Sequence, residues 1–209
     1  TLESTTTGSG NVAVGKAALD SNTTGAENTA VGRSSMDANT TGNYNCAFGY
    51  QSLDAATTAD YNTAVGFQAL TAATTGAFNT AFGSLAAPAI TTGARNVAIG
   101  RNALQTSTTA GYNTACGMQA LQSHTTGDGM NTAVGYNAGD HITTGYRNTL
   151  VGYDTDTSAN DGDRQAIFGE GLTGKGNDTF YTRGGNGAYH SGNTTVWSTT
   201  SDKRIKKNI

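Results

Sequence analysis

A short segment, Asn-Thr-Ala-Val-Gly, recurs nine times along this chain, almost unchanged and at an almost constant interval. Six steps of seventeen residues are followed by one of eighteen and one of seventeen, which places its asparagines at Asn11, Asn28, Asn45, Asn62, Asn79, Asn96, Asn113, Asn131 and Asn148. A fixed period this short is typical of solenoids, in which each repeat is one coil that stacks on the next. The sequence therefore predicts an all-β fold, a parallel β-solenoid or β-roll of 17-residue coils.

Alternation within the repeat indicates which side chains face inwards. In a strand, successive side chains point to opposite faces, and here one face is uniformly small, with alanine at its centre. Because a 17-residue coil is narrow, we expect these alanines inside, together with a leucine six residues further on, at Leu19, Leu53, Leu70, Leu104 and Leu121. The bulky column then points outwards and needs a partner, and it consists of Val14, Val31, Phe48, Val65, Phe82, Ile99, Cys116, Val134 and Val151.

A second constant, Thr-Thr-Gly, separates the copies, as at residues 23–25, 74–76 and 143–145. We expect it to form the return turn of each coil, with its glycine at positive φ. Because the period is so regular, each polar position can form a ladder with its copies in the coils above and below.

Charge and composition exclude several classes of function. The formal net charge is −3, and four of the twelve Lys and Arg residues lie within the last nine positions. We expect no nucleic-acid partner, since that requires a clustered basic face, and no membrane insertion, since no apolar run reaches the roughly 18 residues of a membrane-spanning helix. A thin coil has no pocket of its own, so we expect neither a multi-turnover enzyme nor a cofactor.

The two cysteines fit the repeat without a disulfide. Cys46 and Cys116 lie four coils apart, about 19 Å at ~4.8 Å per coil, which is too far for an intrachain bridge. We expect both to be small buried hydrophobic residues.

The regular repeat ends after Tyr153, which divides the chain into three parts. We expect a shaft of nine coils over residues 1–157, an irregular β neck or tip over 158–200, and the start of a further domain at 201–209. Two metal hypotheses stay open. One is the acidic segment 154–163, because hard cations prefer oxygen ligands. The other is the pair His124 and His141, which fall near one column on successive coils.

The repeat resembles two families of trimeric extracellular fibres. It is similar to the head repeats of trimeric autotransporter adhesins, which use Asn-Ser-Val-Ala-Ile-Gly in a shorter coil of a trimeric β-roll. It resembles more closely the shafts of bacteriophage tail fibres, which carry Asn-Thr-Ala-Val-Gly-Tyr-Asn-Ala-Leu in the same Thr-Thr-Gly frame. The resemblance covers nearly three quarters of the chain. It implies a fibre in which three copies are intertwined or packed together.

The last nine residues, Ser-Asp-Lys-Arg-Ile-Lys-Lys-Asn-Ile, resemble the opening of the endosialidase-like intramolecular chaperone domain of phage tailspikes and fibres. That family trimerises the fibre and then cuts itself off beside the serine of this motif. The resemblance implies Ser201 as nucleophile, Asp202 as its acidic neighbour and Lys206 as general base, with Arg204 and Asn208 structural. We expect the body of that domain beyond Ile209. The alternative is a serine N-cap that opens a basic helix.

Together these resemblances imply a structural and host-receptor-binding fibre of the phage-tail type, matured by one C-terminal self-cleavage. Its expected location is extracellular, on a virion tail. Its expected partners are two further copies of the chain, a host cell-surface glycan or protein, and other tail proteins. Two alternatives stay open. One is a bacterial trimeric surface adhesin, and the other is an ice- or crystal-surface binder that uses stacked Thr-Thr pairs as a flat array of hydroxyl groups.

Overall fold

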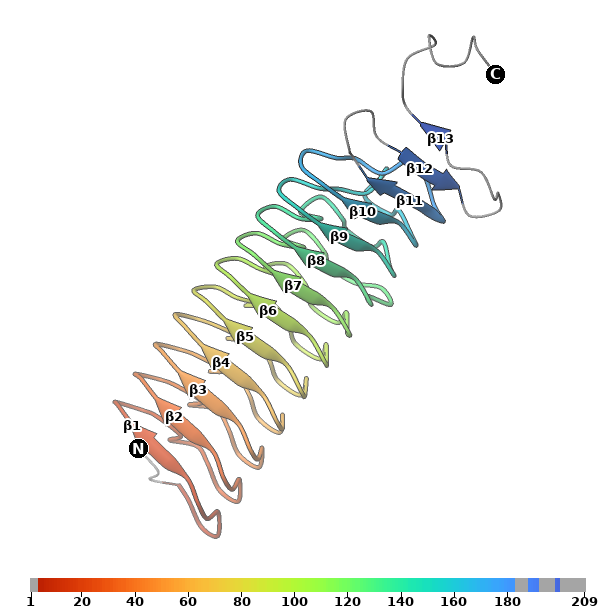
Figure 1. Cartoon of the computed structure of the whole chain (residues 1–209). Helices are drawn as coiled ribbons and strands as arrows, with labels where there is room; N and C mark the ends of the chain where they lie inside the picture. The colour runs from red at the N-terminus through yellow and green to blue at the C-terminus, as the bar shows by residue number, and fades with distance from the viewer. Residues whose placement is uncertain (1–3, 183–187, 192–197, 200–209) are drawn as a thin grey trace, which may run out of the picture.

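In the computed structural model the chain forms an elongated rod of stacked coils (Figure 1). The structure describes residues 4–182, 188–191 and 198–199. The regular secondary structure of these residues consists of β-strands alone. All the strands belong to one sheet, and their order in the sheet follows the sequence. Strands β1 to β11 run parallel, one per coil, so the predicted all-β parallel solenoid of 17-residue coils is confirmed.

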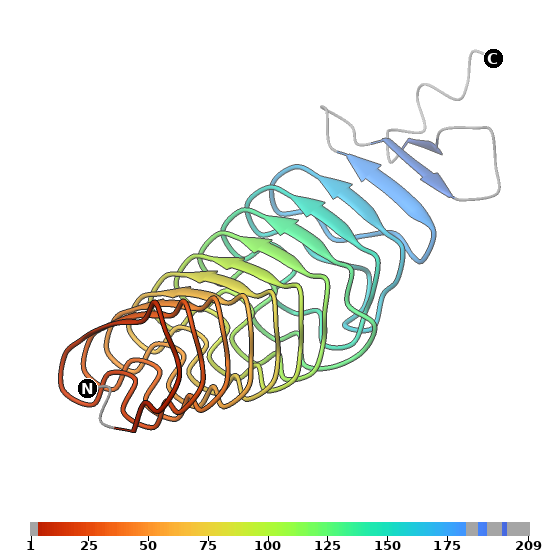
Figure 2. The same cartoon turned by 90° about the horizontal axis from the view of Figure 1, so that it is seen from below.

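The first ten strands are three residues long and begin directly after the position of the repeat asparagine. The strands are β1 (Val12–Val14), β2 (Thr29–Val31), β3 (Cys46–Phe48), β4 (Thr63–Val65), β5 (Thr80–Phe82), β6 (Val97–Ile99), β7 (Thr114–Cys116), β8 (Thr132–Val134), β9 (Thr149–Val151), β10 (Ala166–Phe168), β11 (Thr179–Thr182), β12 (Ala188–Ser191) and β13 (Ser198–Thr199). In the view from below, each coil closes as a loop in which the strand forms one side and turns form the others (Figure 2).

The repeat asparagines form a buried ladder inside the rod. From Asn28 to Asn148 these side chains are at most 2% exposed. The Oδ1 atom of Asn62 accepts a hydrogen bond from the backbone N–H of Asn79 in the next coil, at 2.8 Å, and its Nδ2 atom donates to the carbonyl of Gly76, at 2.9 Å. One amide therefore joins two coils and also ties the start of its own coil to its end.

Alanines and leucines fill the space beside this ladder, as the sequence predicts. The central alanines of β2 to β8 and all five predicted leucines are at most 1% exposed. The bulky column on the same strands points away from them, and Val14 and Phe82 are each 57% exposed. The predicted inner and outer faces of the strand are thus confirmed.

The structure corrects the predicted role of glycine in Thr-Thr-Gly. Most of these glycines do not have positive φ, and the exception is Gly127, at 108°, in the coil of eighteen residues. Instead, a Cβ atom on Gly25 would lie 2.4 Å from the carbonyl oxygen of Gly42, so glycine is needed here because neighbouring coils approach closely. Positive φ occurs at the glycine that ends each strand, between 126° and 143° from Gly15 to Gly152.

Non-glycine residues also take left-handed backbone conformations, three times in almost every coil. In the third coil Gln51, Leu53 and Tyr61 have φ of 51°, 53° and 57°. Such a conformation costs about 1–2 kcal/mol per residue. Each of these residues donates its N–H to a neighbouring coil, at 3.0, 3.0 and 3.1 Å, which offsets the cost. The coil path is therefore favourable only when coils stack on both sides.

The threonine pairs form a second ladder on the far side of the coil. The hydroxyl of Thr23 donates to the carbonyl of Thr40 at 2.9 Å, and that of Thr40 donates to the carbonyl of Thr57 at 3.0 Å. The first threonine of each pair is thus partly buried, whereas the second is exposed.

The parallel stack continues past residue 157, where the sequence predicts the shaft to end. Strand β10 pairs with β9 in the same 17-residue register, and the N–H of Gln165 bonds to Asn148 Oδ1 at 2.9 Å, so Gln165 occupies the asparagine position. β11 follows β10 in parallel after a shorter step of fourteen residues. β12 and β13 then pair antiparallel. The first part of the predicted irregular neck is therefore a tenth coil.

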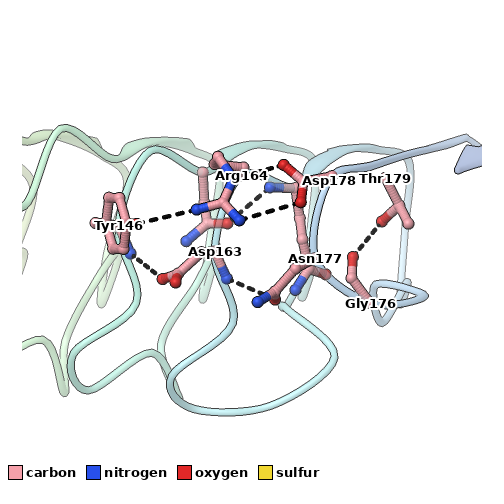
Figure 3. Close-up of polar contacts among 9 residues, drawn as sticks. Tyr146, Asp163, Arg164, Gly176, Asn177, Asp178 and Thr179 are labelled. Atoms are coloured by element: carbon pink, nitrogen blue, oxygen red, sulfur yellow. Dashed lines mark hydrogen bonds and ion pairs between the residues drawn. The ribbon is translucent and has the colours of Figure 1, made fainter. Parts of the chain in front are cut away.

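Exposed side chains connect the last three turns of the stack (Figure 3). The guanidinium of Arg164 bonds to both carboxylate oxygens of Asp178, and it donates to the hydroxyl of Tyr146 at 2.9 Å. The Asp178 pairing raises the pKa of Arg164 and lowers that of Asp178. The N–H of Tyr146 donates in turn to Asp163 at 3.0 Å, and that of Asp163 to Asn177 at 2.9 Å.

We expect the substitution Asn96→Ala to destabilise the rod by about 1–3 kcal/mol, the usual cost of an unsatisfied buried polar group. The buried N–H of Asn113 loses its acceptor at 3.0 Å, and the carbonyl of Ala110 loses its donor at 2.9 Å. Chemical unfolding measures the change. Thr109→Ala, at an exposed position of the same coil, is the control and should change stability by no more than about 0.5 kcal/mol. Equal stability of the two variants would show that the ladder contributes nothing.

Candidate functional site

The exposed apolar side chains of the rod all lie on one surface. Among the described residues, sixteen large hydrophobic side chains are substantially exposed. All of them lie on the side of the rod that the strands form, which we call the strand wall. Each is within a strand, directly before the repeat asparagine or directly after the strand glycine. Along this wall exposed residues alternate with buried ones, as a strand requires. We call this surface the apolar face.

Three columns make up most of the apolar face. The central column is the bulky one predicted from the sequence. The first edge column is the residue before each repeat asparagine position: Glu27, Tyr44, Tyr61, Phe78, Arg95, Tyr112, Met130, Arg147 and Arg164. The second edge column is the residue after each strand glycine: Lys16, Arg33, Tyr50, Phe67, Ser84, Arg101, Met118, Tyr136, Tyr153 and Glu170.

From Tyr44 to Tyr112 the first edge column is an unbroken stack of planar groups. Tyr44 and Tyr61 have ring centroids 4.9 Å apart with an interplanar angle of 9°, and Tyr61 and Phe78 follow at 5.0 Å and 5°. The guanidinium of Arg95 then lies 5.4 Å from the centroid of Phe78 and 5.3 Å from that of Tyr112. The left-handed backbone of these residues repeats in each coil and holds the side chains parallel.

The second edge column stacks in shorter runs. Tyr50 and Phe67 have ring centroids 5.6 Å apart, and Arg33 lies 5.6 Å from the centroid of Tyr50. Tyr136 and Tyr153 form another stacked pair at 5.4 Å. The apolar face is thus bordered on both sides by aromatic and arginine side chains.

Stacking limits what the aromatic columns can recognise. A sugar ring packs against the face of an aromatic ring, but in the first edge column these faces lie against the next ring along the rod. The edges of the rings are left exposed instead, and the hydroxyl of Tyr112 accepts a hydrogen bond from Arg95 at 3.0 Å. This arrangement offers a flat, largely apolar surface and favours a second flat surface over an isolated sugar.

The threonine side of the rod has fewer free hydroxyl groups than the sequence predicts. The first threonine of each pair donates its hydroxyl to the backbone of the next coil, as Thr74 does to Thr91 at 3.2 Å. Only the second threonine, such as Thr75, is fully exposed. Each coil therefore presents one outward threonine, and the predicted array of paired hydroxyl groups is not formed.

The predicted processing residues Ser201, Asp202 and Lys206 lie outside the described residues. The same holds for Arg204 and Asn208. Their roles stay predictions from the resemblance.

The two histidines of the open metal hypothesis do not lie in one column. His124 is fully buried, and its Nε2 atom lies 3.3 Å from the amide nitrogen of Asn131. The side chain of His141 is 70% exposed. The two residues are seventeen positions apart, but the coil between Asn113 and Asn131 has eighteen residues, so the register shifts by one. That shift turns one ring inwards and the other outwards.

The acidic segment 154–163 does not gather into one site either. Asp163 accepts the N–H of Tyr146, and Asp154 and Asp161 are exposed. Only Asp156 faces a possible ligand partner, His141, whose Nδ1 atom lies 2.7 Å from Asp156 Oδ2. The sequence gives no direct sign of this contact, because it joins residues of two different coils.

The cysteines lie on the apolar face. Cys46 and Cys116 are both free and half-buried. The absence of a disulfide between them agrees with their predicted separation, but the prediction that both are buried is wrong, because each projects from the outer side of its strand.

The fold and this surface define a β-solenoid repeat protein with one continuous apolar face. Comparisons with protein-family models, with curated proteins and with solved structures found no match to this chain. No membrane-spanning helix is found in the described part of the chain.

The buried position of His124 predicts a pH effect on stability. Burial lowers the pKa of His124 in the folded rod, whereas the unfolded residue takes up a proton near pH 6.5. As pH falls through that value, the unfolded chain gains protons that the folded chain does not, so stability is lost. The variant His124→Ile should lose less stability than the wild type between about pH 7.5 and pH 5.5.

Isoleucine is a suitable replacement because Ile90 and Ile142 occupy the same position in other coils and are fully buried. All other titratable groups are unchanged, so the difference between the two proteins reports on this ring. Urea unfolding at both pH values measures it. Equal losses in the two proteins would show that His124 does not contribute.

Proposed function

We propose that this chain is the shaft of a homotrimeric extracellular fibre whose copies pack through the apolar face. The observation that carries the proposal is that all sixteen exposed large hydrophobic side chains of the described residues lie on that one face. A stripe of this length is far more apolar than the surface of an ordinary monomer. Packing around an axis parallel to the rod would cover it in every coil.

The edge columns favour copies that lie parallel and in register. In such an assembly the first edge column of one copy meets the second edge column of its neighbour at the same height. Strand β3 is flanked by Tyr44 and Tyr50, and β4 is flanked by Tyr61 and Phe67, so aromatic residues meet aromatic residues. Packing of this kind adds about 0.5–1.5 kcal/mol per aromatic pair beyond the area buried.

Charges along the edges follow the same pattern near both ends of the rod. Glu27 and Arg33 flank β2, and Arg164 and Glu170 flank β10, so opposite charges would meet at these heights. At β6 two arginines, Arg95 and Arg101, would meet instead. The electron-rich faces of the two aromatic rings beside Arg95 attract its guanidinium, which offsets part of this repulsion.

The type of fibre follows from the resemblance of the repeats and of the last nine residues to phage tail fibres. We propose a role in host attachment on a virion tail, with a cell-surface glycan or protein as receptor. The shaft itself is structural and catalyses no turnover. The aromatic rings of the shaft stack on one another, so we expect other parts of the fibre to bind the receptor.

The variant Phe82→Asp should prevent assembly without unfolding the coil. Phe82 is 57% exposed in the single chain, so the rod tolerates a polar side chain there. In an assembled fibre the new carboxylate would enter a dry interface, at a cost of several kcal/mol. Sedimentation should give trimers for the wild type and monomers for the variant. Thr75→Asp, on the threonine side of the rod, is the matched control and should remain trimeric.

Cross-linking tests the orientation of the copies. A chain with Cys46→Thr, Cys116→Val and Val65→Cys carries one cysteine, in the central column. In a parallel, in-register trimer these residues surround the axis at one height, and oxidation should link two copies. A monomeric wild-type chain would refute the proposal, and a trimer without this cross-link would refute the parallel register.

A chain that continues past Ile209 into the chaperone domain should cut itself beside Ser201. Burial of Lys206 on assembly would favour its neutral form. The amine could then take the proton from the Ser201 hydroxyl, whose oxygen attacks the adjacent backbone carbonyl. The peptide C–N bond at that carbonyl breaks as its nitrogen takes the proton back from Lys206, and water then hydrolyses the resulting ester. Ser201→Ala and Lys206→Ala should each leave a trimer of uncut chains. Mass spectrometry of the wild-type trimer decides the matter, since intact bonds on both sides of Ser201 would exclude self-cleavage.

A further inference from the structure

A cluster of metal-ligating side chains lies where the eighth and ninth coils meet, away from the apolar face. The Nδ1 atom of His141 lies 2.7 Å from Asp156 Oδ2 and 3.1 Å from Asp140 Oδ1. One ligand atom from each residue lies within 4.8 Å of the other two. Asp140 and His141 come from one coil and Asp156 from the next, so the cluster spans an interface between coils.

The sequence departs from the repeat at this point. The position eight residues after each repeat asparagine holds a buried leucine in most coils, as at Leu104 and Leu121. In the eighth and ninth coils Gly139 and Asp156 stand there instead. Ile142 and Leu150, both fully buried, still fill the interior of these two coils, but a carboxylate, Asp156, now stands at a position that is apolar in the earlier coils. Departures from a local rule of this kind are typical of functional positions.

The carboxylates are held in place and are poorly solvated. The side chains of Asp140 and Asp156 are each only 17% exposed. The Oδ1 atom of Asp156 accepts the N–H of Thr157 at 2.9 Å, which directs Oδ2 towards the imidazole. Burial raises the pKa of both carboxyl groups. A second interaction that fixes a ligand in this way is typical of metal centres.

The imidazole alone does not satisfy both carboxylates. Nδ1 carries at most one hydrogen, yet two carboxylate oxygens lie within 3.1 Å of it. The charge of the exposed Asp154 also raises the pKa of both His141 and Asp140. The cluster therefore has an excess of negative charge that a cation would balance.

We propose that Asp140, His141 and Asp156 bind one divalent transition-metal ion, such as Zn²⁺. One imidazole nitrogen and two carboxylate oxygens suit such an ion, which prefers ligands at about 2.0–2.2 Å in a tetrahedral arrangement. Tetrahedral ligands at that distance lie about 3.4 Å apart, so the contacts of 3.1 and 2.7 Å would widen by about 0.3 and 0.7 Å to admit the ion. His141 is 70% exposed, so water can occupy the fourth position.

The bound ion would add a coordination link between two coils that are otherwise joined by hydrogen bonds and buried side chains. Two of its ligands belong to the eighth coil and one to the ninth, so opening this interface would require breaking a coordination bond. Metal binding to the folded state alone stabilises that state by mass action. The ion would thus hold the last coils in register, independently of whether the copies assemble.

Titration of the untagged chain with Co²⁺ and Zn²⁺, after removal of metal with a chelator, tests the proposal. We expect one ion per chain, the visible absorption of four-coordinate Co²⁺, and a higher melting temperature with Zn²⁺. His141→Ala and Asp156→Asn should each weaken binding about tenfold or more and abolish the thermal shift. His141 is exposed, so its replacement should leave the fold intact.

Asp54→Asn provides the matched control. Asp54 occupies the same position in its coil as Asp140 does in the eighth coil. Burial, and to a smaller extent the charge of Asp37, raises the pKa of Asp54 as well. The residue after Asp54 is an alanine, however, whereas the residue after Asp140 is His141. This variant should bind metal as the wild type does. A wild-type chain that takes up no metal would overturn the proposal. Binding that survives in both His141→Ala and Asp156→Asn would also overturn it, because the metal would then lie elsewhere.

Discussion

The structure depends on one constraint, the constant register between each coil and the next. The buried asparagine ladder enforces it, because each amide spans two coils and is almost completely excluded from water. A shift of one residue would leave these donors and acceptors unpaired in every coil, at about 1–3 kcal/mol for each buried group. Strands of only three residues suffice for this reason. Equivalent positions fall into straight columns, and any surface chemistry is repeated along the rod.

Most of the fold could be predicted from the period and the alternation within it. The inner alanines and leucines and the outer bulky column all lie where the pattern places them. The tenth coil was missed because Gln165 replaces the asparagine, although its backbone N–H makes the same bond to Asn148. The glycine of Thr-Thr-Gly was misassigned because close approach and positive φ both select glycine. Ala59 and Ala110 occupy that position in two coils, which agrees with an ordinary φ there.

Less of the candidate site could be predicted. The central column follows from alternation, but the stacking at the edges depends on the left-handed backbone of residues such as Tyr61, which no sequence pattern announces. The spacing of His124 and His141 equals the period, which predicts equivalent positions in successive coils. A single residue inserted between them shifts the register, so that His124 faces inwards and His141 faces outwards. Counting each residue from its own repeat asparagine would have separated them. The contact between His141 and Asp156 required the stack itself, because the two residues meet across a coil interface.

The direction of the sheet has a mechanical consequence. The hydrogen bonds between coils point along the rod, so tension on its two ends loads one coil interface after another. Each coil that opens releases seventeen residues, ~56 Å of extended chain at ~3.3 Å per residue, in place of a step of ~4.8 Å. A single rod would therefore lengthen roughly twelvefold where it yields and would dissipate energy coil by coil. Copies packed against the apolar face would share that load, so the surface that assembles the shaft would also make it stiff.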